Sequence, residues 1–250
     1  MFKALDVSAP AMSFQLEDYL SKPFVLVTER LIIVPTPIAI RYDNYVQLYG
    51  GLHASEAFCQ MAFGLHFIAR EWTVEETRDV IFTRDMGRCW KPRGLGDLAV
   101  ALRTRPDGSR VLPSNSERNL KGDETVNIVE DFDFDVLEGV EWVGYAGVRD
   151  AKTTSMPDPE EGDEPLPPWE EMVELRYGVY EKAWGKGVAG EAARAVMQWA
   201  VAEKGVRRFI AETEKTNTRS GKVLQKMGFR ESGTNYWKEP SETEWEKVAA

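Results

Sequence analysis

The chain has 250 residues, 43% of them hydrophobic, and a formal net charge of −10. The length suits one domain with an ordinary core, and the acidic balance suits a cationic substrate better than a nucleic acid, because nucleic-acid-binding proteins engage phosphates through clustered Lys and Arg. No stretch approaches the roughly 18 consecutive apolar residues of a membrane-spanning helix, so we expect no membrane partner. Cys59 and Cys89 form neither a CxxC pair nor a cluster with histidines, so we expect no metal site. The protein is expected to be cytoplasmic and either a monomer or a homodimer.

One strand and two helices are predicted in the first third of the chain. Residues 24–34 are apolar on both sides of a short polar interruption and predict a first strand with a kink. Apolar residues recur at helical spacing over residues 37–49 and again over 73–86. Thr73 suits the N-cap of the second helix, because Glu76 follows three residues later.

Two further strands alternate with two loop insertions in the middle of the chain. Apolar runs at residues 98–102 and 142–148 predict the strands. Between them, residues 104–141 contain Pro, Gly, Asn and Ser followed by an acidic run, which predicts a loop insertion. Residues 156–168 are rich in proline and acidic residues and predict an exposed connector.

A glycine-rich segment follows a predicted strand at residues 173–180 and opens a helix. It runs Trp184-Gly185-Lys186-Gly187-Val188-Ala189-Gly190. A strand that leads through such a turn into a helix directs several backbone N–H groups at one point, with the positive end of the helix dipole behind them. Glycine permits this because a Cβ would hinder the approach of a phosphate. The segment therefore predicts a phosphate or pyrophosphate site, although a tight turn without a ligand would look similar.

A helix, a strand and a second helix are predicted after the glycine-rich segment. The first helix ends at Gly205, and the strand covers residues 209–213. The last helix covers residues 218–227 and is ended by Gly228. One or two strands are expected from Phe229 onward.

Residues 185–190 also match the GxGxxG pattern of dinucleotide-binding folds, and Glu212 lies where such a fold would bind a ribose. Two features argue against that fold. Its strand should directly precede the first glycine and be apolar on both faces, yet four residues intervene here and the strand carries Glu174 and Arg176. Only 38 residues follow Glu212, too few for the remaining strand–helix units. A nicotinamide-binding protein is therefore the minor alternative.

Two separated segments resemble the GNAT superfamily, within it the branch related to the ribosomal-protein N-terminal acetyltransferases (RimJ/RimL-like). Residues 184–192, WGKGVAGEA, resemble the branch's WGKGYATEA loop, and residues 217–229, NTRSGKVLQKMGF, resemble its NxxSxxVLxKxGF segment. Residues 28–31, TERL, resemble its TERL opening. The strong match covers about residues 173–230, and the N-terminal half agrees only in layout.

The resemblance implies the GNAT fold, an α/β (α+β) architecture with a central mixed, mostly antiparallel sheet flanked by helices. A single domain would span residues 1–250, with the insertions at about 104–141 and 156–168 as additions. The glycine-rich strand-to-helix loop would bind acyl-CoA.

Three positions depart from the family's pattern. Trp184 stands where the general pattern has Gln or Arg, which the branch tolerates, and Val188 replaces the usual Tyr. The tyrosine that many relatives carry on the last helix as a general acid is absent. The resemblance therefore leaves the proton donor to the departing thiolate open.

The resemblance also implies which residues contact the cofactor. These are Trp184, Gly185, Lys186, Gly187, Val188, Ala189, Gly190, Asn217, Ser220 and Lys222. Asn217 would bond the pantetheine arm, and Ser220 would lie near the thioester sulfur. Lys182 and Arg219 are further candidates for the phosphates, whereas Asn217 would also serve as an ordinary helix cap.

Acyl transfer to an amine requires the amine to be neutral, so a base must take its proton. Glu174 is the first candidate and Glu212 the second, and each would otherwise be a strand carboxylate paired with a nearby Arg. Ser220 is the candidate proton donor.

The implied activity is acetyl-CoA-dependent N-acetylation of a primary amine, which would be a small molecule, an amino acid or a peptide N-terminus. Acetyl-CoA would be the cosubstrate, and no metal is needed. A non-catalytic acyl-CoA sensor is the alternative, and an NAD-dependent oxidoreductase the more distant one. The acceptor pocket is expected between the N-terminal helices and the connector before Glu174. Its aromatic walls would be Phe63, His66, Phe67, Trp72 and Trp90, although core packing explains an aromatic cluster more often than a ligand does.

Overall fold

The computed structural model describes residues 14–65, 67–111, 117–122, 124–130 and 132–249. Its strands form one ten-stranded sheet in the order β4-β5-β1-β2-β3-β6-β7-β8-β10-β9. Every neighbouring pair is antiparallel except β7 and β8. The strands are β1 Val25–Val27, β2 Leu31–Pro35, β3 Asp97–Leu102, β4 Glu117–Leu120, β5 Val126–Val129, β6 Trp142–Asp150, β7 Val173–Val179, β8 Arg208–Glu214, β9 Arg230–Glu231 and β10 Glu242–Val248. The mixed, mostly antiparallel sheet expected from the sequence is confirmed.

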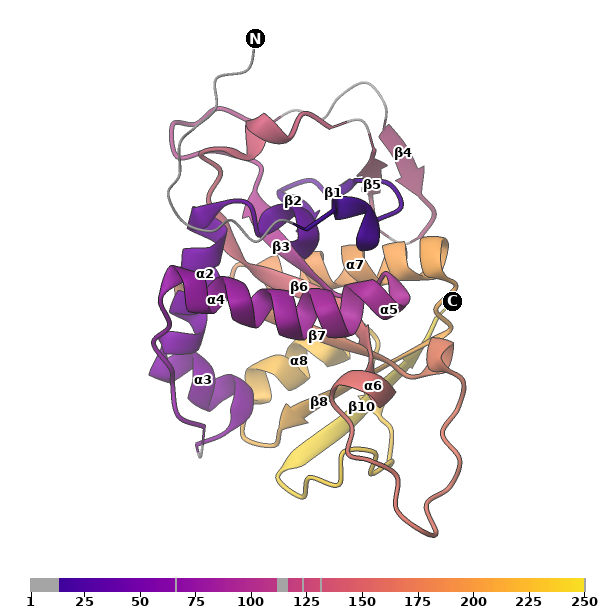
Figure 1. Ribbon diagram of the computed structural model, residues 1–250. Helices are drawn as coiled ribbons and strands as arrows, with labels where there is room; N and C mark the ends of the chain where they lie inside the picture. The colour runs from indigo at the N-terminus through magenta and orange to yellow at the C-terminus, as the bar shows by residue number, and fades with distance from the viewer. Residues whose placement is uncertain (1–13, 66, 112–116, 123, 131, 250) are drawn as a thin grey trace.

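Helices cover both faces of the sheet (Figure 1). The α-helices are α1 Thr36–Ala39, α2 Asp43–Ala54, α3 Glu56–Phe63, α4 Val74–Val80, α5 Lys91–Arg93, α6 Ala151–Thr154, α7 Val188–Lys204 and α8 Thr218–Lys226, and a π-helical segment, Ile81–Trp90, joins α4 to α5. Helices α2 and α4 cross in front of the sheet in Figure 1, whereas α7 and α8 lie behind it. Short 3-10 turns are Leu16–Asp18, Phe134–Leu137, Trp169–Glu171 and Glu181–Ala183.

The two helical layers meet around one end of the sheet. Trp199 of α7 stacks on Phe24 at a ring-centroid distance of 5.3 Å and lies 6.0 Å from Trp90 at the end of the π-helical segment. Trp90 and Trp199 are each 1% exposed, so this contact is part of the core rather than of a pocket. Trp90 is therefore a packing residue, contrary to its expected place in the acceptor wall.

Strands β7 and β8 pair only at their beginnings. The parallel register joins Val173 to Phe209 and Glu174 to Ile210, and it then stops although both strands continue, to Val179 and Glu214. The strands therefore separate and leave an opening within the sheet. A cavity can extend from one face of the sheet to the other only where such an opening interrupts the hydrogen-bonded ladder.

Three predictions for the N-terminal half are corrected. The single strand predicted over residues 24–34 is two strands, because Thr28 turns the chain: its N–H donates to the carbonyl of Leu31 at 3.0 Å and its Oγ1 accepts from the N–H of Leu31 at 3.0 Å. The helix predicted over residues 37–49 is interrupted between α1 and α2. The helix predicted from Thr73 has the expected capping box with Glu76 but continues to Arg93 through the π-helical segment.

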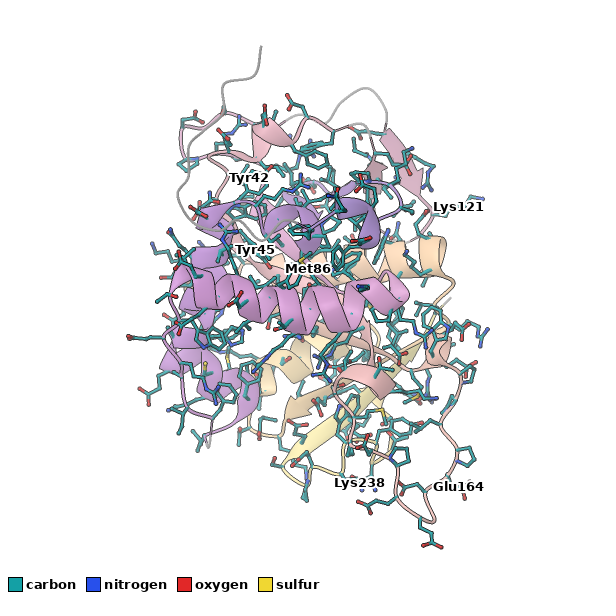
Figure 2. The ribbon with its side chains drawn as sticks, in the orientation of Figure 1. Tyr42, Tyr45, Met86, Lys121, Glu164 and Lys238 are labelled. Carbon is teal, nitrogen blue, oxygen red and sulfur yellow. The ribbon has the colours of Figure 1, made fainter. Side chains whose placement is uncertain are left out.

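The insertion expected as a loop at residues 104–141 contains two strands. β5 pairs with β1 and β4 pairs with β5, so this segment extends the sheet at one edge. Residues 156–168 contain no helix or strand, as predicted. Lys238 holds this connector by ion pairs with Glu160 at 3.3 Å and Asp163 at 3.0 Å, and Glu164 lies at its outer end (Figure 2).

Candidate active site

A cavity of about 460 Å³ occupies the opening between β7 and β8. Its wall combines the glycine-rich loop and α8 from one face of the sheet with α3 from the other. Because side chains alternate along a strand, Tyr177 of β7 lies on the face of α8, whereas Glu174 and Arg176 lie on the opposite face. The cavity therefore passes through the sheet and joins two chemically different halves.

The glycine-rich loop brings the beginning of α7 to the first half of the cavity. Gly185 and Gly187 have φ values of +73° and +79°, which favour glycine, and α7 starts at Val188. The indole Nε1 of Trp184 donates to the carbonyl of Val179 at 2.7 Å and holds the loop against the end of β7. Gly187 supplies no side chain that could cap α7, so the first N–H groups of this 17-residue helix face the cavity wall.

The turn between β1 and β2 anchors this loop from the side. Glu191 in the first turn of α7 accepts from Thr28 Oγ1 at 2.5 Å and from Arg30 Nε at 2.6 Å. Arg30 also donates to the carbonyl of Lys186 at 2.9 Å. These contacts give the TERL segment its structural role, since they fix the loop relative to the sheet.

The first half of the cavity suits an anion. Arg194, Arg219 and Lys226 line it beside the beginning of α7, and a helix N-terminus with adjacent cations favours phosphate groups. All loop residues named from the sequence line the cavity except Lys186, which is exposed at its edge. Lys222 does not line it either.

Asn217 and Ser220 lie together where the cavity enters the sheet. Asn217 caps α8 by accepting from the N–H of Ser220 at 3.1 Å, as the sequence predicts, and its amide donates to the carbonyl of Met61 in α3 at 2.8 Å. Asn217 thus links the two helical layers across the cavity. Much of its side-chain hydrogen bonding is already used within the protein.

Tyr177 is a site residue that the sequence does not reveal. Its hydroxyl oxygen lies 2.7 Å from Ser220 Oγ and 3.3 Å from the Ser220 carbonyl oxygen. Burial raises the pKa of Tyr177 to about 12, an effect that the hydrogen bond to Ser220 only partly offsets, so the phenol stays protonated at neutral pH. In the sequence Tyr177 looks like an ordinary apolar position of an alternating strand.

Glu174, the first candidate base, is held in an ion pair. Its two oxygens accept from Arg149 at 2.8 and 2.7 Å, and Ser155 also donates to it. Burial by itself would raise the pKa of Glu174, but the charge and hydrogen bonds of Arg149 and the hydrogen bond of Ser155 lower it. A carboxylate stabilised in this way is a poor proton acceptor, so the geometry disfavours Glu174 as the base.

Glu212, the second candidate, lies next to Glu242 of β10 in the second half of the cavity. The Oε2 atom of each is buried and receives no hydrogen bond from any donor among the described residues. Burial, the hydrogen bond with Glu242 and the charges of Glu174 and Glu242 raise the pKa of Glu212 to about 10. The carboxyl group of Glu212 therefore keeps its proton at neutral pH, and Glu212 alone is not a ready base.

Replacing Glu212 with Gln is expected to stabilise the protein at alkaline pH. Unfolding returns the pKa of Glu212 from about 10 to its ordinary value of 4.5, so the folded protein retains a proton that the unfolded chain has lost. The stability that comes with this proton is complete below pH 4.5 and is lost as the pH rises toward 10. At pH 8 the free energy of unfolding should rise by about 1–3 kcal/mol in Glu212→Gln, since Gln has no proton to lose.

Denaturant unfolding at pH 4.5 and pH 8 measures this effect. The gain should nearly vanish at pH 4.5. Glu231→Gln makes the same substitution at an exposed position of β9 and should change stability little at either pH. An equal gain for Glu212→Gln at both pH values would show that the pKa of Glu212 is not raised.

Four apolar side chains of α3 cover this second half, namely Phe58, Met61, Ala62 and Phe63. Of the aromatic side chains expected there, Phe63 is the one among the described residues that lines the cavity. Phe67 packs against Phe63 at a centroid distance of 4.6 Å and Trp72 against His53 at 5.2 Å, without reaching the cavity. His66 lies outside the described residues.

Within the described ranges, no group of three or more His, Cys, Asp or Glu side chains could hold a metal ion. Both cysteines are buried and unpaired with one another, in keeping with a packing role. Among the helices that the structure describes, none is both long enough and apolar enough to cross a membrane. The nicotinamide alternative is not supported either, because a dinucleotide-binding fold needs a parallel sheet and only β7 and β8 are parallel here.

Comparisons with known proteins identify the family. Residues 46–230 match the family described as the acetyltransferase (GNAT) domain. The fold is similar to that of an acetyltransferase from Agrobacterium tumefaciens str. C58, with 19% identity, a TM-score of 0.53 and 99% of each chain covered. It is also similar to a GNAT-family acetyltransferase from Bacillus anthracis, with 17% identity, a TM-score of 0.51, and 90% of this chain and 98% of that chain covered.

A third similar structure is that of the microcin C7 self-immunity acetyltransferase MccE in complex with acetyl-CoA and AMP, with 10% identity, a TM-score of 0.50, and 89% of this chain and 94% of that chain covered. No curated protein matches the sequence. The family match covers most of the chain and includes the glycine-rich loop and α8, where the sequence resemblance is strongest. This chain is therefore an acyltransferase that belongs to the GNAT acetyltransferase family.

Proposed function

We propose that this protein transfers an acetyl group from acetyl-CoA to a primary amine of a small molecule, an amino acid or a peptide N-terminus. The observation that carries the proposal is the cavity through the sheet, with an anion-binding helix N-terminus in one half and a buried carboxyl pair in the other. A phosphate-bearing thioester and a cationic amine would then approach each other from opposite faces. The acetyl-CoA complex of the structurally similar MccE supports the same donor.

In this proposal the glycine-rich loop and the first turn of α7 bind the phosphates of acetyl-CoA. Gly185, Gly187 and Gly190 keep the loop open to the ligand, and Arg219 and Lys226 add positive charge. Asn217 and Ser220 follow along the cavity toward the sheet opening. Bound acetyl-CoA supplies the acetyl thioester, and the protein supplies orientation and proton transfer.

The carboxyl pair Glu212 and Glu242 is assigned to the amine. A cationic amine would meet two carboxyl groups there, and it must lose a proton before it can attack. The pair accepts that proton, while Ser220 on the other side of the opening directs its hydroxyl hydrogen at the departing sulfur. Glu174 keeps Arg149 and the floor of the cavity in place.

Two measurements test the proposed function. Thermal unfolding with acetyl-CoA, CoA and NAD in parallel should show a higher midpoint with acetyl-CoA and CoA only, because a ligand that binds only the native state stabilises it. Thiol release from acetyl-CoA should then be followed with a panel of small amines, amino acids and peptides. Stabilisation by acetyl-CoA without release for any amine would favour the sensor, and stabilisation by NAD alone would overturn the proposal.

A further inference from the structure

Ser220 is a weak acid by itself. A serine hydroxyl ionises only at a pH far above that of a thiol, so it acts on a departing thiolate chiefly by presenting its hydrogen as a hydrogen-bond donor. A hydroxyl hydrogen rotates among staggered positions, and in the first turn of a helix it can instead donate to a nearby carbonyl. Something must therefore fix the direction in which the Ser220 hydrogen points.

Tyr177 is placed to do so. Its hydroxyl lies 2.7 Å from Ser220 Oγ, and the alternative acceptor, the Ser220 carbonyl oxygen, is farther away at 3.3 Å. Because the phenol remains protonated, it can donate to Ser220 Oγ. The hydrogen of Ser220 is then free to point into the cavity, which both side chains line.

We infer that Tyr177 is a positioning residue for Ser220, so that the two hydroxyls form one hydrogen-bond chain directed at the departing sulfur. This inference rests on the proposed function. The proton that the amine loses before its attack goes to the carboxyl pair. The C–N bond then forms as the C–S bond breaks, the electron pair goes to sulfur, and the second proton of the amine nitrogen passes to that sulfur, so that CoA leaves as the thiol. The thiolate accepts the hydrogen bond of Ser220, and Tyr177 keeps its own proton.

Tyr177→Phe removes the hydroxyl and keeps the ring in place. We expect kcat to fall about tenfold while the KM for acetyl-CoA stays within about twofold, because the lost hydrogen bond acts only as charge develops on sulfur. Ser220→Ala should lower kcat at least as much. The double variant should be no slower than Ser220→Ala alone, since Tyr177 acts only through Ser220.

A second measurement needs no acceptor amine. The pKa of the thiol of bound CoA, followed by thiolate absorbance, should rise by about one unit in Tyr177→Phe and at least as much in Ser220→Ala, because both variants weaken stabilisation of the thiolate. Tyr45→Phe is the matched control. Tyr45 is fully buried away from the cavity, and its hydroxyl has no hydrogen-bond partner in the part of the chain that the structure describes.

The outcomes separate this inference from the proposed function. A wild-type protein that binds CoA but releases no thiol with any amine would overturn the function, while the thiol pKa would still test the hydroxyl pair. A wild-type protein that binds no CoA would overturn both. If the wild type is active but Tyr177→Phe keeps the wild-type kcat and the wild-type thiol pKa, the positioning role of Tyr177 is refuted and the proposed function is not. Additive losses in the double variant would refute that role as well.

Discussion

Replacing Gly187 with Leu is expected to weaken CoA binding by at least about 100-fold while the protein remains folded. Gly187 has a φ of +79°, where a side chain costs about 1–2 kcal/mol, and only Arg30 would lie near an added Cβ, at 3.4 Å. The protein itself thus leaves room for a Cβ at this position. The phosphates do not, because the Leu side chain would stand at the beginning of α7 where they approach the backbone N–H groups.

Gly205 offers a matched control for backbone strain. It lies at the other end of α7 with a φ of +69°, and an added Cβ would meet no atom within 4 Å. Gly205→Leu should therefore lower the unfolding midpoint about as much as Gly187→Leu but leave CoA affinity unchanged. Calorimetric titration of both variants with CoA measures the difference, and wild-type affinity in Gly187→Leu would refute the placement of the phosphates.

The sequence predicted the C-terminal half well because its signals are local. Gly205 in the left-handed conformation ends α7, and Asn217 caps α8, so each boundary is encoded within a few residues. The alternation of apolar and polar residues along β7 and the glycines of the loop are likewise local signals in the sequence. The family resemblance was also strongest in this half.

The N-terminal half was predicted less well because its structure depends on distant contacts. The turn at Thr28 separates two apolar runs that look like one strand, and nothing nearby in the sequence states that β5 will pair with β1 about 100 residues away. A continuous helix from Thr73 was also expected to stop near Met86. The π-helical segment carries it on to Trp90, whose indole donates to the carbonyl of Asp97 at 3.2 Å.

The chemistry of the candidate site depends on tertiary contacts in the same way. From the sequence Glu174 is the first candidate for the base. In the structure Arg149, from the neighbouring strand β6, donates to both of its oxygens. Glu242 has no role assigned from the sequence, yet its carboxyl group lies against Glu212. The sequence pointed to the glycine-rich loop, Asn217 and Ser220, which line the cavity, but not to Tyr177 or Glu242. The protonation of the site depends on neighbours that only the fold brings together.

Replacing Glu242 with Gln is expected to lower kcat at least about 100-fold, with little change in the KM for acetyl-CoA, whose proposed site is on the other face of the sheet. At neutral pH Glu212 keeps its proton, because its pKa is raised to about 10, so Glu242 is the member of the pair that we assign as the base. Glu212→Gln retains the Glu242 carboxyl group and should cost much less, about tenfold or less. Glu242→Gln also removes two of the causes that raise the pKa of Glu212, so the ratio of its activity to wild-type activity should increase as the pH rises and Glu212 ionises, at a lower pH than in the wild type.

Glu244→Gln is the control for this pair of variants. Glu244 lies on the same strand and face as Glu242, but its oxygens accept from the N–H of Trp237 at 2.9 Å and from Thr234 at 2.5 Å and do not line the cavity. Its kcat should stay close to that of the wild type. A larger loss of kcat in Glu212→Gln than in Glu242→Gln would show that Glu212 is the base. A wild-type kcat in both variants would show that neither carboxyl group takes part in the reaction. The asymmetry between the two variants therefore shows whether Glu242 accepts the amine proton while Glu212 keeps its own.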